Sequence, residues 1–479
     1  MPSGKENVKS KYDVIIIGAG IGGLICGSYL AKNKLKVLIV EKHYQAGGCC
    51  TSFRRKGFVF DSAAHLFGSC GNRQMFGIFL SHLTLGNIFK QLDPTDSLNF
   101  PDETINIPKD IDCYIKFLQN RFPEDKEGIK SFFKELLRIS YHEKRMHILE
   151  KYQNSYYGDF LNSFFKSNRL KTILTSQCIY LATEPKRLST IAMGLMLNSY
   201  LKDGAFYPMG GVQSFVNEIV KKYIYFGGHI KLNADVKEIR IKNGIANGIV
   251  CENGDNYTAK IVVSNCDASK TFTQFINEKE MDELFICKIA TLKKSYSYFC
   301  DYLGVDSETK DLQDLRGWHF TSYDMNEEFF NAIYIFVPNA IDVSLAPKGK
   351  SIVEVFRVWK NIDDKYMDFK QRVEILSRDN MARLEQIKPG ITNKVIMREM
   401  ATPYTIEKYT ANSDGAVSGW EMSPTSIFKN RLDFKTPIEN LFLVGHWTNP
   451  GGGIASVALS GFILANNILN RKNSPDEIK

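Results

Sequence analysis

The chain has 479 residues, 44% hydrophobic and 24% charged, which is typical of a globular protein long enough for two domains. Lysine and arginine exceed aspartate and glutamate by 61 to 53, and this excess is spread along the chain, which argues against a nucleic-acid-binding protein. Residues 14–31 form an uncharged apolar run of membrane-spanning length, but such runs are too few for a polytopic membrane protein, which is excluded.

The first predicted unit is the stretch DVIIIGAGIGGLICGSYLA at residues 13–31. A secretory signal or a membrane anchor should be poor in glycine, whereas five glycines interrupt this run. A buried parallel strand at 13–17, a tight turn and a helix to about Lys32 use every part of the stretch instead. The residues predicted to bind a dinucleotide in this unit are Gly18, Gly20, Gly22 and Gly23.

A second strand is predicted at 36–40, and it ends in Glu41, 18 positions beyond Gly23. A carboxylate at the tip of this strand accepts hydrogen bonds from the ribose hydroxyls of an adenosine. Strand, glycine motif, helix, second strand and acid fall within one unit of about 30 residues, which makes the pattern specific. We therefore predict a Rossmann unit that binds a dinucleotide, with Glu41 and Lys42 among its contacts.

Residues 42–68, KHYQAGGCCTSFRRKGFVFDSAAHLFG, place a second glycine pair directly after the ribose acid. This stretch resembles the segment that follows the Rossmann unit in FAD-dependent amine oxidases, phytoene desaturases, carotenoid isomerases and retinol saturases. In those proteins the segment touches the pyrophosphate and the ribityl chain of FAD. The resemblance implies cofactor contacts at Gly47, Gly48 and Cys49, although the family pattern often has arginine where this chain has Cys49.

Two long segments, 70–205 and 286–430, are predicted to form the substrate-binding part of the protein. In the first, rich in phenylalanine and leucine at helical spacing, we expect helices at 75–89, 131–142 and 159–182. In the second we expect strands at 295–305, 332–338 and 350–359. Such aromatic stripes are typical of a hydrophobic core as well as of a ligand-binding tunnel, so the pattern does not identify a substrate.

Residues 235–263 alternate like strands and contain Asn243-Gly244 and Asn253-Gly254, two strong hairpin signals. They predict a β-meander followed by a return strand at 260–263. In flavoproteins of the two-dinucleotide type such a meander crosses over the nucleotide unit. The resemblance therefore implies that the backbone of Val236 meets the adenine.

The stretch NLFLVGHWTNPGGGIASVALSGFILANNIL, residues 440–469, supplies a third glycine-rich turn. It predicts a buried strand at 441–444, a loop, and a helix over 454–469. The start of a helix carries about half a positive charge and unpaired N–H groups, so it can stabilise the anionic edge of a reduced flavin. The stretch resembles the C-terminal flavin motif of the desaturases, which implies cofactor contacts at Gly445, His446, Gly453 and Ile454.

Over almost its full length the chain resembles the phytoene desaturase, carotenoid isomerase and retinol saturase superfamily of amine-oxidase-like flavoproteins. The resemblance implies FAD as cofactor and an α/β fold. A Rossmann-like FAD-binding domain with a β-meander is joined by a discontinuous α+β substrate domain, whose mixed sheet is covered by helices. We predict the FAD-binding domain at 1–69, 206–285 and 431–479. The substrate domain is predicted at 70–205 and 286–430, with its helical part as the candidate membrane-facing surface.

The predicted function is oxidoreduction of a hydrophobic, carotenoid-like polyene or isoprenoid. Desaturation, saturation and cis–trans isomerisation by hydride exchange with flavin N5 all remain open. His65 is the candidate catalytic acid or base, because imidazole titrates at about pH 6.5; the alternative is a hydrogen-bonded structural residue or a flavin contact. FAD amine oxidases and non-catalytic prenyl-binding chaperones of the GDP-dissociation-inhibitor type share the scaffold. The intact glycine motifs argue against the chaperone.

The ten cysteines include no CxxC pair and no histidine partner at metal-ligand spacing. We therefore predict reduced thiols, no metal site and a cytoplasmic location. The mild basic excess suits peripheral contact with the inner face of a membrane or with an acidic carrier protein. The main expected partner is a hydrophobic small-molecule substrate.

Overall fold

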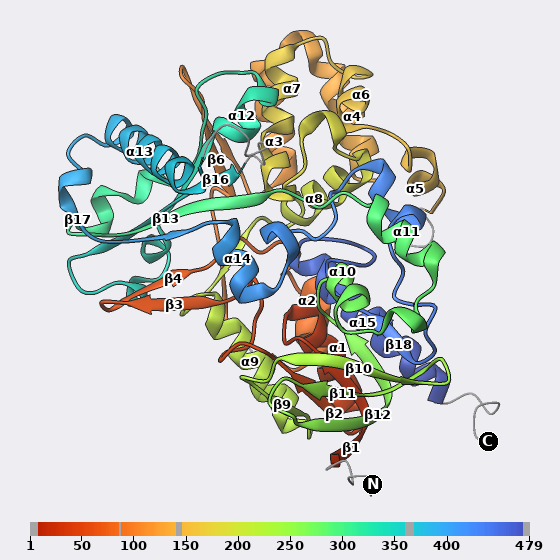
Figure 1. Cartoon of the computed structure of the whole chain (residues 1–479). Helices are drawn as coiled ribbons and strands as arrows, with labels where there is room; N and C mark the ends of the chain where they lie inside the picture. Colours follow the sequence, from red (N-terminus) through yellow and green to blue (C-terminus); the bar gives the residue numbers. More distant parts are fainter. Residues whose placement is uncertain (1–7, 86–87, 140–145, 360–367, 473–479) are drawn as a thin grey trace, which may run out of the picture.

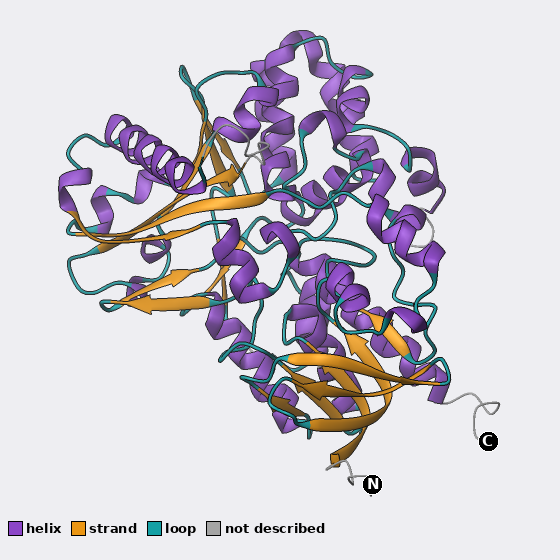
Figure 2. Cartoon of the chain, viewed as in Figure 1, coloured by secondary structure: helices purple, strands orange, loops and turns teal. Residues whose placement is uncertain are grey.

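The computed structural model describes residues 8–85, 88–139, 146–359 and 368–472 (Figure 1). Within these residues the strands form two seven-stranded sheets and two two-stranded ribbons. Figure 2 shows the two large sheets in separate parts of the molecule, with helices packed around both. The mixed α/β architecture with a Rossmann-like unit confirms the predicted fold class.

The first sheet has the strand order β10-β11-β12-β1-β2-β9, and β18 pairs with β12. Its strands are β1 (Val8–Ile17), β2 (Val37–Val40), β9 (His229–Lys231), β10 (Val236–Lys242), β11 (Ile245–Cys251), β12 (Asn256–Ser264) and β18 (Leu441–Leu443). β1 lies at its centre and pairs in parallel with both β2 and β12. The strands predicted at 13–17 and 36–40 are confirmed, and β1 already begins at Val8.

Strand β1 is apolar on both faces because both faces are covered. Val14 and Ile16 belong to the hydrophobic cluster that contains residues of α1 (Ile21–Lys32), α9 (Val212–Tyr225) and α15 (Ile454–Lys472). Ile15 and Ile17 belong to a second cluster, together with residues of the meander. Successive side chains of a strand point to opposite faces, so a strand buried on both sides reads as a continuous apolar run.

Strands β10, β11 and β12 form the predicted meander. Its first hairpin turns at Asn243 and Gly244, which have φ angles of 54° and 76°, the positive values that a tight hairpin turn of this kind requires. The prediction of a separate return strand at 260–263 is wrong. These residues continue β12, which pairs with β11 in its first half and with β1 along its length.

The second sheet has the order β17-β13-β16-β15-β14-β6-β7. Its strands are β6 (Asp96–Asn99), β7 (Thr104–Ile107), β13 (Ser297–Val305), β14 (Gly317–His319), β15 (Ile333–Phe336), β16 (Ser351–Trp359) and β17 (Val395–Ala401). The three strands predicted in this part of the chain correspond to β13, β15 and β16 and are confirmed. β6 and β7 were not predicted; they come from the segment for which we expected helices, and they join the sheet through parallel pairing of β6 with β14.

One face of the second sheet packs on α13 (Phe369–Ile387), and the other packs on the helical region. The helices of this region are α3 (Ile111–Arg121), α4 (Lys126–Leu136), α5 (Met146–Tyr152), α6 (Tyr157–Asn162), α7 (Asn168–Thr175) and α8 (Thr190–Leu201), whereas α2 (Met75–His82) packs with α15 in the cluster of the first sheet. In Figure 1 most of them gather at the end of the molecule away from the first sheet. No described helix combines the length and apolarity needed to cross a bilayer.

Several helix boundaries differ from the predictions. The single helix predicted at 159–182 is wrong, because Ser167 caps a new helix: its Oγ accepts a hydrogen bond from Leu170 N, so α6 and α7 are separate and a short 3-10 helix follows. The helix predicted at 75–89 ends at His82, and β5 (Phe89–Gln91) begins where it was expected to end. The helix predicted at 131–142 overlaps α4, and its last residues lie outside the described residues.

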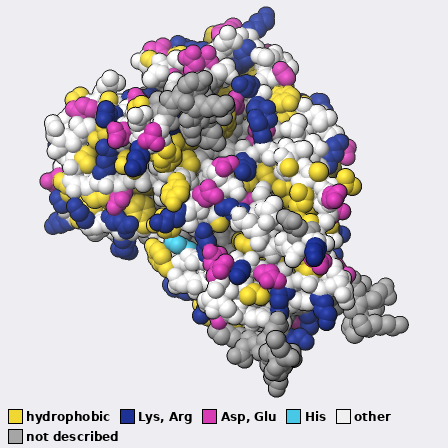
Figure 3. All heavy atoms as spheres, in the orientation of Figure 1, with side chains coloured by type: hydrophobic (Ala, Val, Ile, Leu, Met, Phe, Trp, Pro, Cys, Tyr) yellow, Lys and Arg dark blue, Asp and Glu magenta, His cyan; other side chains and the backbone are white. Residues whose placement is uncertain are grey.

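The remaining elements connect the two sheets or cover their edges. They are β3 (Ser52–Arg55), β4 (Phe58–Asp61), β8 (Phe206–Pro208), α10 (Ala268–Thr273), α11 (Glu283–Thr291), α12 (Met325–Asn331) and α14 (Pro403–Thr410). Over most of the face seen in Figure 3, basic and acidic side chains are interspersed. This agrees with the even spread of charge along the sequence.

Candidate cofactor and substrate site

All three glycine-rich turns border one cavity. The predicted cofactor-binding residues that line it are Gly18, Gly20, Glu41, Lys42, Gly47, Gly48, Cys49, Val236, Gly445, His446, Gly453 and Ile454. The predicted catalytic residue, His65, lines it as well. The fold thus brings both ends of the chain and the meander to a single place.

Gly22 and Gly23 do not line the cavity but let backbone segments meet behind it. A Cβ atom at Gly22 would lie 3.1 Å from Gly445 Cα and 2.8 Å from Asn265 Oδ1. A Cβ atom at Gly23 would lie 2.4 Å from the carbonyl oxygen of Gly18. The distances of 2.8 and 2.4 Å are too short for a Cβ atom and 3.1 Å is tight, so the two glycines let the first turn close and lie against the C-terminal turn.

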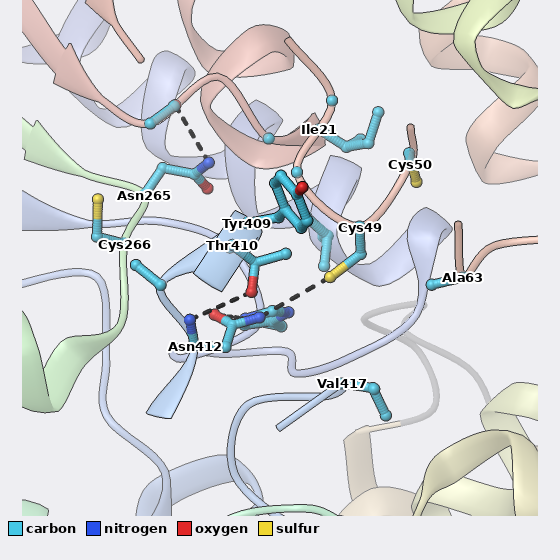
Figure 4. A pocket seen from close by; sticks show the side chains of 18 of the residues that line it. Ile21, Cys49, Cys50, Ala63, Asn265, Cys266, Tyr409, Thr410, Asn412 and Val417 are labelled. Atoms are coloured by element: carbon cyan, nitrogen blue, oxygen red, sulfur yellow. Dashed lines mark hydrogen bonds between the residues drawn. The ribbon is translucent and has the colours of Figure 1, made fainter. Parts of the chain in front are cut away.

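Asn265 is a site residue that the sequence predictions missed. It directly follows β12; its backbone N–H donates to Ile17 O at 2.8 Å and its side-chain Nδ2 donates to Gly18 O at 3.2 Å. Figure 4 shows this side chain beside the first turn. The signal was available, because ligands of doubly wound sheets bind outside the carboxyl ends of the parallel strands, and Asn265 occupies such an end.

Glu41 is held in place by the backbone. Its Oε2 accepts a hydrogen bond from Ala19 N at 2.7 Å and its Oε1 accepts one from His43 N at 2.9 Å. Burial raises the pKa of the Glu41 carboxyl, and the two backbone donors oppose that rise. The neighbouring Lys42 ammonium donates to Lys408 O at 2.9 Å, on α14. The carboxylate therefore keeps further lone pairs available at the cavity wall, as a ribose diol requires.

The C-terminal turn positions the start of α15. Gly445 and Gly453 both have φ angles of 98°, which favour glycine, and Gly445 N donates to Ser460 Oγ at 2.9 Å. α15 begins at Ile454, which lines the cavity, and no acidic residue occupies its first turn. The positive end of the helix dipole therefore lies at the cavity without an internal counter-charge from that turn.

His446 borders the cavity and is half-buried. Burial, and to a smaller extent the nearby Arg431 guanidinium, lower its pKa to about 3. Arg431 itself donates through Nη2 to the carbonyl oxygen of His446 at 2.5 Å. His446 is therefore a neutral imidazole at physiological pH.

This pKa makes the stability of the cofactor-free protein sensitive to acid. Between pH 6.5 and 3 an unfolded histidine binds a proton that folded His446 does not, so stability falls as the pH falls. We expect a loss of about 2 kcal/mol from this residue between pH 7.5 and 5. Urea unfolding at both pH values measures this loss. His446→Gln should lose about 2 kcal/mol less unfolding free energy on acidification than the wild type. An equal loss in both proteins would contradict the lowered pKa of His446.

His65 lies at the cavity wall with both ring nitrogens engaged. Its Nε2 lies 2.9 Å from Glu354 Oε2, and the backbone of Ala63 also hydrogen-bonds the ring. The rings of Phe356 and Phe336 pack on the imidazole, with centroids 4.3 and 4.9 Å away. Burial lowers the pKa of His65 to about 4. The imidazole therefore offers no free nitrogen to a molecule in the cavity.

Glu354 is part of a buried carboxyl pair. Asp61 accepts hydrogen bonds from Ser52 Oγ at 2.6 Å, Val212 N at 2.9 Å and Tyr207 Oη at 2.5 Å, a set of donors that suits an ionised carboxylate. Glu354 Oε1 accepts from Asp61 N at 3.1 Å. Burial and the charge of Asp61 raise the pKa of Glu354 well above its ordinary value. These directions favour a protonated Glu354 that donates to the neutral imidazole of His65.

Three tyrosines form an aromatic part of the cavity wall: Tyr180, Tyr200 and Tyr298. Their hydroxyl groups donate to Asp96 Oδ2 at 2.7 Å, Leu66 O at 3.2 Å and Ile179 O at 2.7 Å, respectively. With each hydroxyl engaged by the protein, the wall offers mainly aromatic surface. Helical spacing alone does not distinguish these tyrosines from core residues.

A second cavity adjoins the first. The two share Leu66, Tyr200, Gly453 and Ile454. The apolar residues that line the second cavity include Met75, Leu181, Leu195, Met196 and Met422. Space for an apolar molecule therefore continues from the start of α15 into the helical region.

The family model described as an NAD(P)-binding Rossmann-like domain matches residues 16–82. Prolycopene isomerase 1 from an Oncidium hybrid cultivar is 27% identical, over 97% of this chain and 85% of its own length. The neurosporene-forming phytoene desaturase of Rhodobacter capsulatus is 24% identical, over 96% of this chain and 94% of its own. The all-trans-retinol 13,14-reductase of Danio rerio is 23% identical, over 92% and 83%.

Over nearly its full length the chain is similar to these relatives, and it fits the carotenoid desaturase, carotenoid isomerase and retinol saturase superfamily of amine-oxidase-like proteins. A solved putrescine oxidase, bound to putrescine, matches this chain with a TM-score of 0.67 at 13% identity, over 96% of this chain and 100% of its own. That likeness shows the shared amine-oxidase-like fold. The protein is an oxidoreductase, and its Rossmann-like unit together with these relatives implies a flavin-type dinucleotide as the cofactor.

Proposed function

We propose that the protein is an FAD-dependent oxidoreductase that acts on a hydrophobic, carotenoid-like polyene or isoprenoid. The main observation behind this proposal is that one cavity is lined by three glycine-rich turns and by an aromatic wall. This cavity adjoins a second cavity with an apolar lining. Bound FAD would supply hydride exchange at N5, in desaturation, saturation or cis–trans isomerisation. We place the protein in the cytoplasm, with peripheral membrane or carrier contact as the source of its apolar substrate.

The donor set of the cavity fits FAD. Gly18 and Gly20 offer backbone that no Cβ blocks, Glu41 offers carboxylate oxygens for a ribose, and the start of α15 offers unpaired N–H groups. Val236 lines the same cavity from the meander. A nicotinamide dinucleotide would account for the first turn and Glu41 but would leave the C-terminal turn without a ligand.

The protein's own contribution is alignment and exclusion of water. Tyr180, Tyr200 and Tyr298 present aromatic surface to an apolar chain, and His65, held by its contact with Glu354, is a positioning residue at the cavity wall. The helix dipole at Ile454 favours negative charge on the reduced cofactor. Among the described residues that line the cavity, the acidic ones are Glu41 and Asp235, beside the first sheet. The aromatic wall therefore lacks a lining carboxylate to hold a substrate ammonium group.

Anaerobic bleaching tests this function. FAD-loaded protein is mixed with carotenoid, retinoid and other isoprenoid candidates, the flavin absorbance is followed, and the products are identified by mass. A mass change of two hydrogens would mark desaturation or saturation, and a new geometric isomer of unchanged mass formed with added reduced flavin would mark isomerisation. Peroxide release with polyamines, while every polyene stays inert, would establish amine oxidation instead.

The role of Glu41 predicts a selective loss of affinity. Glu41→Gln removes the charge that accepts from the ribose, so we expect FAD to bind about 10- to 100-fold more weakly. FMN lacks the adenosine, and its affinity should change less than threefold. Fluorescence titrations with both flavins check this, and an equal loss for FMN and FAD would show that Glu41 acts only through the fold.

A further inference from the structure

The side chain of Asn412 connects Cys49, near the start of the chain, with the consecutive residues His446 and Trp447 near its end. Its Oδ1 lies 3.0 Å from Trp447 Nε1 and 3.2 Å from His446 Nε2, and its Nδ2 lies 3.8 Å from Cys49 Sγ. The side chain is buried, and both Asn412 and His446 line the cavity. Figure 4 shows Asn412 between Cys49 and the backbone of its own loop.

The tryptophan fixes the orientation of this amide. Indole Nε1 can only donate, so the atom of Asn412 that faces Trp447 must be the carbonyl oxygen. The amide nitrogen then faces the Cys49 sulfur, which can accept. The assignment does not depend on a choice between two equivalent flips, because the reversed amide would place two donors against each other.

The amide in turn fixes the tautomer of His446. Asn412 Oδ1 only accepts, so His446 Nε2 must carry a hydrogen and donate it. A neutral imidazole has only one N–H, which leaves Nδ1 as a bare acceptor. No hydrogen bond from the described part of the chain reaches Nδ1. The ring lines the cavity directly after Gly445, whose Cα would lie 3.1 Å from a Cβ atom at Gly22 in the first turn.

We propose that His446 Nδ1 is a fixed acceptor for an O–H or N–H group of the flavin cofactor, and that Asn412 is the positioning residue that sets this tautomer. The proposal rests on the proposed function, because FAD must occupy the cavity. Gly445 lies close to the first glycine-rich turn, and His446 directly follows it. His446 is therefore on the side of the cavity that the glycine-rich turns form, and not in the aromatic wall. An imidazole fixed in this way adds an acceptor without adding a negative charge beside the flavin.

Two substitutions separate the two ring nitrogens. In His446→Asn the amide is attached at Cγ, as Nδ1 is, so an acceptor can stand at the Nδ1 position. In His446→Gln the amide is attached one carbon further out, near the Nε2 position, so contact with Asn412 is kept and the Nδ1 acceptor is lost. We expect His446→Asn to bind FAD within threefold of the wild type, and His446→Gln to bind it 10- to 30-fold more weakly. Titration of the cofactor-free protein by flavin fluorescence measures both.

The double variant tests the role of Asn412. Asn412→Leu removes the acceptor that fixes the tautomer, so it should weaken FAD binding on its own but add less than threefold to the loss caused by His446→Gln. Additive losses would show that Asn412 acts on the fold and not through His446. Tight binding by His446→Gln with weak binding by His446→Asn would overturn the Nδ1 assignment. A wild-type protein that binds no FAD would contradict the proposed function itself, whereas the variants test only the role of His446 and Asn412.

Discussion

Gly22→Val should leave a folded protein that purifies with less than a tenth of the wild-type FAD content. A Cβ atom at this position would lie 3.1 Å from both N and Cα of Gly445 and 2.8 Å from Asn265 Oδ1, so the side chain must push the C-terminal turn away from the first one. Overpacking of this kind costs about 1–3 kcal/mol, and if the whole cost falls on the cofactor-bound state it corresponds to a loss of about 5- to 150-fold in cofactor affinity. The flavin-to-protein absorbance ratio, with titration of the cofactor-free protein, measures it.

Gly158→Ala is the matched control. Gly158 lies in α6, and a Cβ atom there would meet nothing within 4 Å. Removing a glycine from a helix should stabilise the protein by about 0.4–1 kcal/mol and leave the FAD content unchanged. Wild-type FAD content in Gly22→Val would mean that the contact between the two turns does not shape the cofactor site.

Glu354→Ala should lower the free energy of unfolding by about 2–4 kcal/mol, whereas Glu354→Gln should change it by less than about 1 kcal/mol. The alanine variant leaves Asp61 N–H and His65 Nε2 without their buried partner. Glutamine reproduces a protonated glutamic acid: its oxygen can accept from Asp61 N–H and its nitrogen can donate to His65. Urea unfolding of both variants at pH 7 measures the difference.

The glutamine variant decides the charge of this pair. If Glu354 were ionised beside an imidazolium, Glu354→Gln would remove a buried ion pair and leave a charged histidine, at a cost of about 3–5 kcal/mol. Equal destabilisation by glutamine and alanine would therefore contradict the neutral pair. The direction of the pKa of Glu354, raised by burial and by Asp61, favours the neutral arrangement.

Local spacing in the sequence was enough to predict the Rossmann unit and the meander. The glycines of the first turn, Glu41 after the second strand and Asn243-Gly244 at the hairpin act within a few residues of chain, where backbone geometry allows few alternatives. The resemblance to flavoproteins added Gly445 and its neighbours. The prediction missed the break between α6 and α7, although Ser167 is a capping residue, because the apolar period continues across it.

The sequence by itself determined which backbone turns can approach a dinucleotide, since that depends on glycine, on strand ends and on helix starts. Only the tertiary structure decided what the side chains around those turns do. Asn412 meets Trp447 and Cys49, and Glu354 meets His65, from positions 35, 363 and 289 residues apart. Hydrogen-bond donors and acceptors select partners by distance and direction in space, and no spacing along the chain encodes such pairs.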